Sequence, residues 1–282
     1  MSYYPGYSDE AIHWISGRTI ENQLYFLSHY LKDHSFQGKS VLDCGSGTGE
    51  LAFQIASMGY RVVGFDLESE KYASNWSLLE AQAKEKGYSL ELRGGIDATD
   101  VQFLNDSSFD IVFFLTVLYH LHNPQKALSE AHRLLRPGGL LATSDTDPET
   151  TVFLPTNEFV DSARRAIERH AEKMGEHHRF GREHPKYLRE EGFEIKYRSA
   201  SYDYCSGKKI QSISTMIVKK LESPDMRAFF EDERNHDLLP GSGDVGKRMK
   251  TMADQVTLWG KDQDAFVAVS RFEVLGEKPK II

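Results

Sequence analysis

The sequence predicts an α/β fold in which a mostly parallel β-sheet is covered by helices on both faces. Segments typical of strands alternate with segments typical of helices between residues 40 and 144, and this alternation favours parallel strands joined by helical crossovers. The short apolar run at 111–115 is typical of a strand buried on both faces. At 41–52 an apolar strand passes through a glycine-rich turn into a helix, an arrangement that places a ligand site at the carboxyl edge of the sheet.

The expected elements follow in order along the chain. Asn123 and Pro124 introduce one helix, since asparagine caps helices and proline suits their first position. Within the core, strands are expected at 40–44, 61–66, 89–93, 109–114 and 139–144, and helices at 49–58, 69–86 and 124–136. Beyond residue 145 we expect a charged helix at 158–175, a basic histidine-rich link at 176–185, a helix at 186–191, a strand at 193–204, a mostly helical block at 207–260 and a strand at 265–276.

Composition limits the kind of protein. A chain of 282 residues suits one core domain with extra helices. The net charge of −8 and the lack of a basic run argue against a nucleic-acid partner. Two cysteines form no disulfide framework or metal-ligand pattern, as in a reducing compartment. No apolar run reaches the about 20 residues of a membrane span, and the polar start of the chain is unlike a signal peptide. We therefore expect a cytoplasmic protein.

The glycine-rich turn indicates the kind of ligand. Gly45, Gly47 and Gly49 let the backbone turn tightly and approach a ligand without a Cβ in the way. The spacing differs from the Gly-x-Gly-x-x-Gly of pyrophosphate sites, and Asp43 just before the turn suits a cationic ligand. Asp66 ends the second strand, where ribose hydroxyls are bound in doubly wound sheets. These residues together predict a nucleoside ligand without phosphate.

Residues 41–50 followed by Asp66, together with 94–98, 108–120 and 134–141, resemble in order and spacing the motifs of class I S-adenosylmethionine-dependent methyltransferases. The whole chain is more loosely similar to their UbiE-like small-molecule branch. This resemblance implies a Rossmann-like, seven-stranded, mostly parallel sheet. It also implies a domain at 38–282 with a helical cap insertion at about 206–262. The N-terminal region at 1–37 is expected from its own residues: apolar positions at helical spacing over 9–32 predict helices that cover one edge of the cofactor cleft, and the aromatic segment at 1–8 is either an arm that folds over a ligand or a tail held on the surface.

By the same resemblance, the cofactor S-adenosyl-L-methionine has a defined set of binding residues. Asp43, Gly45, Ser46 and Gly47 would line its methionine part, and Asp66 and Leu67 its ribose. Asp97 and Ala98 would meet the adenine, and Leu115 and Thr116 would lie beneath the methionine chain. Arg18 either reaches the cofactor carboxylate or forms a surface ion pair. His120 follows the fourth strand, where it is either a general base or a packing residue beside the cofactor.

Two further groups leave alternatives open. His177, His178, Arg179, Arg182 and His184 favour a solvated loop, and the alternative is a mobile lid whose cations meet an acidic substrate. Asp145 and Asp147 either end a strand or chelate a divalent ion, and we predict no metal site.

The predicted function is methyl transfer to an O or N nucleophile of a small molecule, including a secondary metabolite, by a monomer or homodimer. The alternative is a protein of this fold that binds the cofactor while catalysing a cyclisation or serving as a binding module. A protein substrate is a further reading. The sequence decides neither the substrate nor the acceptor atom.

Overall fold

A computed structural model of the chain describes residues 38–67, 70–177 and 179–280. These residues divide into two compact units. The first, here called the sheet unit, comprises the described residues up to Thr146, then Arg179–Ala200 and the chain from Phe272 onward. The second, the helical unit, comprises Asp147 to residue 177 and Ser201–Arg271. The predicted N-terminal arm, its helices and Arg18 lie outside the described residues.

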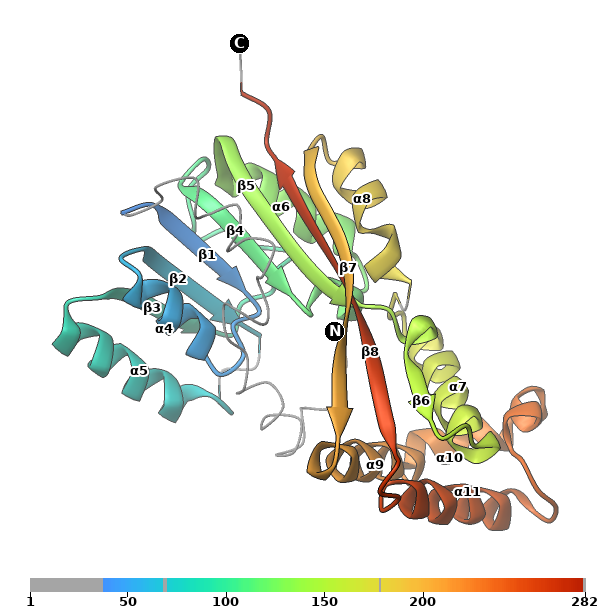
Figure 1. The fold of residues 1–282 in the computed structure, drawn as a ribbon. Helices are drawn as coiled ribbons and strands as arrows, with labels where there is room; N and C mark the ends of the chain where they lie inside the picture. The colour runs from blue at the N-terminus through green and yellow to red at the C-terminus, as the bar shows by residue number, and fades with distance from the viewer. Residues whose placement is uncertain (1–37, 68–69, 178, 281–282) are drawn as a thin grey trace. The chain divides into compact units, whose positions relative to one another are not determined.

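Five parallel strands form the centre of the sheet unit. They pair in the order β3-β2-β1-β4-β5 (Figure 1), with the bounds Ser40–Cys44 for β1, Arg61–Asp66 for β2, Ser89–Gly94 for β3, Phe109–Leu115 for β4 and Leu135–Thr146 for β5. Four of the five follow the predicted bounds to within one residue. β5 is longer at both ends than the predicted 139–144. At its start, Leu135 already pairs with Phe109 of β4.

Two long strands extend this sheet. β8 (Phe266–Glu277) lies beside β5, and β7 (Glu194–Ser206) pairs with β8. The amide of Gly138 donates to the carbonyl of Lys278 at 2.8 Å, and the amide of Lys278 donates to that of Gly139 at 2.9 Å. This reciprocal bonding is the antiparallel pattern, and Figure 1 shows β8 running opposite to β5. Within the described residues the sheet is mostly parallel, as predicted, but it has eight strands instead of seven, because the short β6 (Val152–Leu154) also pairs with β8.

Helices cover both faces of the sheet unit, as predicted. α4 (Glu50–Ser57) and α5 (Ala73–Lys86) lie on one face, and α6 (Pro124–Leu134) and α8 (Phe180–Glu190) lie on the other (Figure 1). Each face of the sheet packs against its helices in a hydrophobic core, and alternate residues of the central strands point into one core or the other. Val41, Ile111 and Phe113 pack with α4 and α5, whereas Leu42, Val112 and Phe114 pack with α6 and α8. This alternation follows from the two-residue period of a strand, and it explains the continuous apolar runs.

The prediction of a solvated link at 176–185 is wrong for its second half. α8 begins at Phe180 and continues past Pro185. Phe180, His184 and Leu188 recur at helical spacing, and all three are fully buried. The charged side chains of the same segment point outward, so its composition resembles that of a loop although its buried stripe is helical. His184 is therefore a core residue and not part of a solvated loop.

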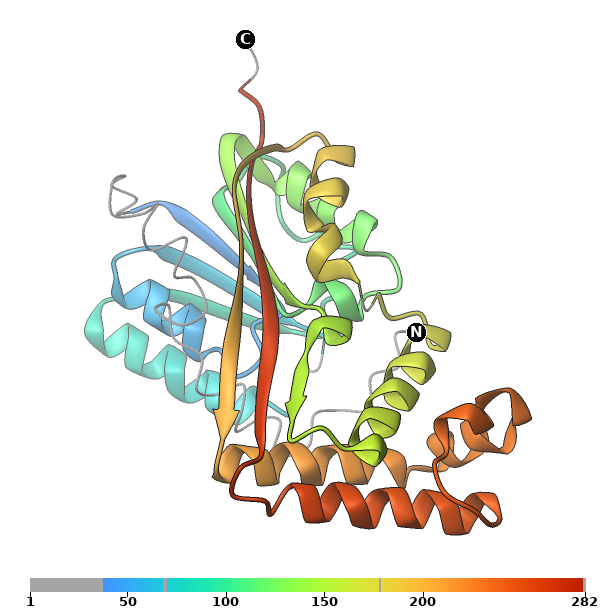
Figure 2. The ribbon, with the colours of Figure 1, turned by 45° about the vertical axis from the view of Figure 1, so that its right-hand side comes forward.

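The helical unit consists mainly of packed helices. α9 (Lys208–Leu221) and α11 (Val245–Trp259) lie side by side (Figure 2), and both contact α7 (Glu158–Lys173). The short β6 (Val152–Leu154), which the sequence did not indicate, pairs antiparallel with the start of β8. Three further elements belong to this unit: α10 (Pro224–Glu231) and the 3-10 helices η2 (Pro148–Thr150) and η3 (Glu233–Leu238).

The predicted cap insertion at about 206–262 falls within the helical unit, which also includes α7. Its boundaries as an insertion stay a prediction. None of the helices in the described part of the chain combines the length and the hydrophobicity that crossing a membrane requires.

Candidate functional site

The turn between β1 and α4 folds back against the end of β2. The amides of Gly45 and Ser46 both donate to the carbonyl of Phe65, at 2.8 and 2.9 Å. The hydroxyl of Ser46 donates to the carbonyl of Asp43 at 2.9 Å. These bonds turn the chain sharply as β1 ends, so the loop lies at the carboxyl edge of the parallel strands, where open α/β sheets bind ligands.

At two positions of the turn, a glycine is required because φ is positive and because a Cβ would collide with a neighbouring side chain. Gly45 and Gly49 have φ values of +78° and +81°, a region that side chains disfavour. A Cβ on Gly45 would lie 2.5 Å from Val117 Cγ2, and one on Gly49 would lie 2.8 Å from Leu92 Cδ1. The turn therefore has the tight conformation that the alternate glycines predict, and it packs directly against the segment after β4.

The carboxylate of Asp66 lies beside this turn. Its Oδ2 accepts a hydrogen bond from the amide of Gly47 at 2.9 Å. Its carbonyl accepts from the amide of Ile96 at 3.2 Å. Asp66 thus joins the turn, the end of β2 and the loop after β3. Leu67 follows it with 47% of its surface exposed. Both residues lie where the predicted ribose would bind, and their contact with a ribose stays a prediction.

Asp43 places a carboxylate within the strand that leads into the turn. The residue is only 3% exposed. Burial, and then the negative charge of Asp43, raise the pKa of the Cys44 thiol well above its usual value. Cys44 therefore stays protonated and is a poor nucleophile. Asp43 accordingly supplies negative charge at the start of the turn, which suits the cationic ligand predicted from the sequence.

The loop after β3 brings Asp97 and Ala98 to the same edge. Ala98 is buried at 8% exposure. The Oδ1 of Asp97 accepts from the amide of Thr99 at 2.8 Å, and its carbonyl accepts from the amide of Asp100 at 3.0 Å. The side chain of Asp97 therefore stabilises its own loop, and binding of an adenine amine by this carboxylate stays a prediction.

The segment after β4 is the strained part of the site. Leu115, the last residue of β4, is buried, and Thr116 follows with φ of +62°. A β-branched residue rarely adopts this conformation, and such outliers gather at functional sites. The amide of Thr116 donates to the carbonyl of Ser144 at 2.6 Å. The ends of β4 and β5 therefore hold Thr116 at the carboxyl edge, where the predicted cofactor chain would lie.

His120 ends the short 3-10 helix η1 (Leu118–His120) that follows Thr116. Its amide donates to the carbonyl of Val117 at 3.1 Å, and its ring centroid lies 3.7 Å from that of Tyr119. The imidazole is half-buried. This position, four residues beyond Thr116, is compatible with both readings of the sequence, a general base and a packing residue.

Two residues of α5 fix the turn, and sequence reasoning missed both. Trp76 Nε1 donates to the carbonyl of Gly47 at 2.9 Å, and Asn75 Nδ2 donates to that of Thr48 at 2.7 Å. Both bonds join residues nearly thirty positions apart in sequence, so no local sequence pattern predicts them. A tryptophan and an asparagine near the start of the helix after β2 were the only signal available.

The other predicted groups lie apart from the turn or outside the described residues. Within the described part of the chain, no group of three or more His, Cys, Asp or Glu side chains is arranged to hold a metal ion. Asp145 pairs with the buried His184 at 3.1 Å. Arg18 and His178 fall outside the described residues.

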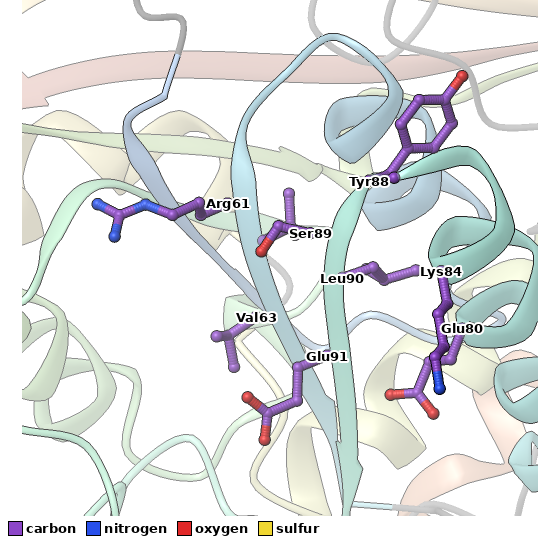
Figure 3. Close-up of a pocket in the computed structure, with 10 residues that line it drawn as sticks. Arg61, Val63, Glu80, Lys84, Tyr88, Ser89, Leu90 and Glu91 are labelled. Atoms are coloured by element: carbon purple, nitrogen blue, oxygen red, sulfur yellow. The ribbon is translucent and has the colours of Figure 1, made fainter.

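A groove of about 600 Å³ lies at the opposite end of the sheet unit (Figure 3). It is lined by the first residues of β2 and β3 and by the end of α5, including Arg61, Lys84, Tyr88 and Glu91. None of the predicted cofactor residues lines it. Ligands of open α/β sheets bind at the carboxyl ends of the strands, so this groove is not the site predicted from the sequence.

A glycine turn after β1, an acid at the end of β2 and a second acid after β3 meet at one edge of a doubly wound sheet. This arrangement defines the class of α/β domains that bind a nucleoside-containing cofactor. Residues 42–143 match the family model described as a methyltransferase domain. This part of the chain is therefore a methyltransferase domain, and its fold is that of the class I, S-adenosylmethionine-dependent enzymes, as predicted.

Similarity to individual proteins agrees with this assignment. The chain is 34% identical over 156 residues to the "Probable methyltransferase ltbC" of Aspergillus luteorubrus, covering 51% of this chain and 52% of the relative. It is 29% identical over 121 residues to the ubiquinone biosynthesis O-methyltransferase of Maricaulis maris, covering 43% and 46%. The chain thus spans about half the length of the curated relatives that it matches.

Solved structures share the fold over most of the chain. The YcgJ protein of Bacillus subtilis superposes with a TM-score of 0.56 at 17% identity, covering 92% of this chain and 100% of that protein. At this identity the likeness shows the fold alone.

Proposed function

We propose that this protein transfers a methyl group from S-adenosyl-L-methionine to an O or N nucleophile of a small molecule. One observation carries the proposal: within the methyltransferase domain, the glycine turn is closed by the bond from the amide of Gly47 to Asp66 at 2.9 Å. The acid and the turn thus lie together at the carboxyl edge of a doubly wound sheet, the edge at which such sheets bind nucleosides, and this supports the proposal.

The residues at this edge fit the cofactor chemically. Asp43 supplies negative charge for the ammonium and sulfonium groups, and Gly45, Ser46 and Gly47 leave the backbone open to the methionine part. Asp66 and Leu67 would bind the ribose, Asp97 and Ala98 the adenine, and Leu115 and Thr116 the methionine chain. Arg18 would bind the cofactor carboxylate. The bound cofactor would supply an electrophilic methyl group, so the protein needs chiefly to orient a nucleophile.

His120 is the proposed general base. It follows β4 at the carboxyl edge, and its half-buried imidazole could take a proton from a hydroxyl or amine. The name of one relative, a ubiquinone biosynthesis O-methyltransferase, is consistent with an oxygen acceptor. We further propose a cytoplasmic monomer or homodimer without a nucleic-acid or membrane partner, in keeping with the net charge of −8.

Calorimetric titration with S-adenosylmethionine and with S-adenosylhomocysteine tests the cofactor assignment. Binding of both is expected, and the Asp66→Ala variant is the control for the site. A metabolite extract incubated with a methyl-labelled donor then tests transfer. Binding without label transfer to any metabolite or protein would favour the alternative, a cyclising enzyme or a binding module of this fold. Absence of binding would overturn the cofactor assignment.

A further inference from the structure

An ion pair on α6 lies against the chain that follows β3. Arg133 Nε donates to Glu130 Oε1 at 3.0 Å, and Arg133 Nη2 donates to Glu130 Oε2 at 2.8 Å. The two side chains are 29% and 20% exposed. Two parallel bonds between a guanidinium and a carboxylate fix the geometry of both groups. These two residues, here called the α6 pair, therefore form one rigid polar unit on the helix.

The α6 pair binds the backbone of Val101 on both sides. The amide of Val101 donates to Glu130 Oε2 at 3.0 Å, and Arg133 Nη2 donates to the carbonyl of Val101 at 3.0 Å. Val101 is 1% exposed and packs in the hydrophobic core that α6 lines. Because its amide, its carbonyl and its side chain are all bound, Val101 has a fixed position relative to α6.

The same arginine binds the chain that leads from Val101 towards β4. Arg133 Nη1 donates to the carbonyl of Leu104 at 3.1 Å and to Asp106 Oδ1 at 2.6 Å. The amide of Ser107 donates to the carbonyl of Arg133 at 3.0 Å. Residues 101–107, all of them described, form no helix or strand of their own. Their conformation therefore depends on this one side chain.

The loop that carries Asp97 is attached at both ends. Its first attachment is the amide of Ile96, which donates to the carbonyl of Asp66 at 3.2 Å. Its second attachment is Val101, which the α6 pair holds. Between them, Asp97 Oδ1 accepts from the amide of Thr99 at 2.8 Å, so the turn itself is compact. The position of Asp97 at the carboxyl edge therefore depends on where the α6 pair holds Val101.

We propose that Arg133 and Glu130 are positioning residues: they fix this loop so that Asp97 selects the 6-amino group of adenine. The selectivity rests on the proposed function, in which Asp97 accepts from that amine and Ala98 lies against the ring. The attachment of Val101 is a property of the protein without ligand. A displaced carboxylate loses its hydrogen bond to the amine, whereas the proposed ribose and methionine contacts come from other loops and are retained.

Hydrogen exchange followed by mass spectrometry on the full chain tests the attachment without ligand. In Glu130→Ala, the peptide covering 96–105 should exchange about tenfold faster, because the amide of Val101 loses a charged acceptor. In Arg133→Ala the same peptide should also exchange faster, since the carbonyls of Val101 and Leu104 lose their charged donor. Unaltered exchange of this peptide in both variants would overturn the proposal, as would equal acceleration of every peptide.

Arg136→Ala is the matched control. Arg136 Nη1 and Asp110 Oδ2 are 2.7 Å apart, and this pair joins the starts of β5 and β4. Its loss should leave the exchange of 96–105 within about threefold of that of the unmodified protein. If Arg133→Ala does not fold, Arg133→Lys replaces it. One ammonium cannot bind both carboxylate oxygens and two carbonyls at once, so exchange of 96–105 as slow as in the unmodified protein would overturn the proposal.

Calorimetric titration with two ligands tests the selectivity. S-adenosylhomocysteine carries the 6-amino group, and S-inosylhomocysteine carries an oxygen in its place. The unmodified protein should bind the first about tenfold or more tightly, because the carboxylate of Asp97 accepts from the amine and repels the oxygen. In Arg133→Ala this ratio should fall to about threefold or less, and Arg136→Ala should retain it. A loss of stability weakens both ligands alike, and equal weakening in Arg133→Ala would overturn the selectivity.

The Asp97→Ala variant separates this proposal from the proposed function. Its ratio should already be close to one, and the addition of Arg133→Ala should change the ratio no further. A further change in the double variant would overturn the action of Arg133 through Asp97. Equal binding of both ligands by the unmodified protein would overturn the selectivity and leave the cofactor assignment standing. Exchange that follows the prediction in a protein that binds neither ligand would support the attachment and overturn the cofactor assignment.

Discussion

The carboxylate of Asp66 accepts the amide of Gly47 at 2.9 Å, so the end of β2 holds the turn that follows β1. The two residues are nineteen positions apart in sequence. Because one Oδ2 atom closes the loop, the acid has a structural role in addition to the proposed contact with a ribose. A substitution of Asp66 is therefore expected to affect both the conformation of the turn and the proposed binding of the ribose.

Asp66→Ala should weaken binding of S-adenosylmethionine about tenfold or more, because both the loop contact and the proposed ribose acceptor are lost. Asp66→Asn keeps one acceptor oxygen, so its affinity for S-adenosylmethionine should lie between those of Asp66→Ala and the unmodified protein. Calorimetry measures the affinities, with Asp100→Ala at an exposed acid nearby as the control. Equal affinity of all four proteins would remove Asp66 from the site.

Gly45→Ala should destabilise the turn, because Gly45 has φ of +78° and a Cβ there would lie 2.5 Å from Val117. Gly87→Ala is the matched control, since Gly87 has φ of +73° with nothing within 4 Å of its Cβ position. The control isolates the conformational cost, which is about 1 kcal/mol. Thermal unfolding and cofactor titration should show a larger loss in Gly45→Ala, and a similar effect of the two substitutions would refute the steric contact.

His120→Ala should lower turnover about 10²-fold or more while leaving cofactor affinity within about threefold, if the imidazole is a general base. The assay uses the acceptor found in the labelled-metabolite screen. His122→Ala, at an exposed histidine two residues away, is the control. A His120→Ala protein with unchanged turnover across pH would assign the side chain to packing.

The stability of the protein should depend on pH through Asp145. Burial raises the pKa of this carboxyl group above 3.8 in the folded protein. The folded state then binds the proton more tightly than the unfolded state, so this stabilisation is present below 3.8 and is lost as pH rises through the folded pKa.

The measurement compares the free energy of unfolding of the unmodified protein with that of Asp145→Asn across this range. The difference should shift in favour of the Asn variant as pH rises, and the hydrogen bond to His184, which lowers the pKa of Asp145, reduces the size of this shift. A difference that is constant with pH would show that Asp145 titrates alike in both states.

Much of the fold could be predicted because the signals are local. The apolar run of β4, the cap at Asn123 and Pro124 and the glycines between β1 and α4 each depend on residues within a few positions. The structure confirms these elements: Asn123 Oδ1 accepts from the amide of Lys126 at 3.0 Å, and the strands β1 to β5 are parallel, as expected. The positions of Asp43, Asp66 and Asp97 at strand ends follow from the same local patterns.

In α8, the polar composition of the segment led to the wrong prediction of a solvated link. Arg179, Arg182 and Pro185 predict a polar link, yet Phe180 and His184 form part of a buried helical stripe. The stripe contains a histidine, and such a residue is acceptable in a core because Asp145 and Thr143 lie within hydrogen-bond distance of its two ring nitrogens. The partner, Asp145, is thirty-nine positions earlier in the chain.

The sequence by itself determined the class of domain and the residues at its carboxyl edge, since strand periods, glycine turns and strand-end acids act over short distances. Only the tertiary structure decided that Trp76 and Asn75 hold the glycine turn, that Asp66 closes it, and that Asp145 and His184 meet behind Thr116. The physical reason is that a hydrogen bond depends on separation in space, and residues far apart in sequence come within hydrogen-bond distance of one another only after the sheet and its helices have packed.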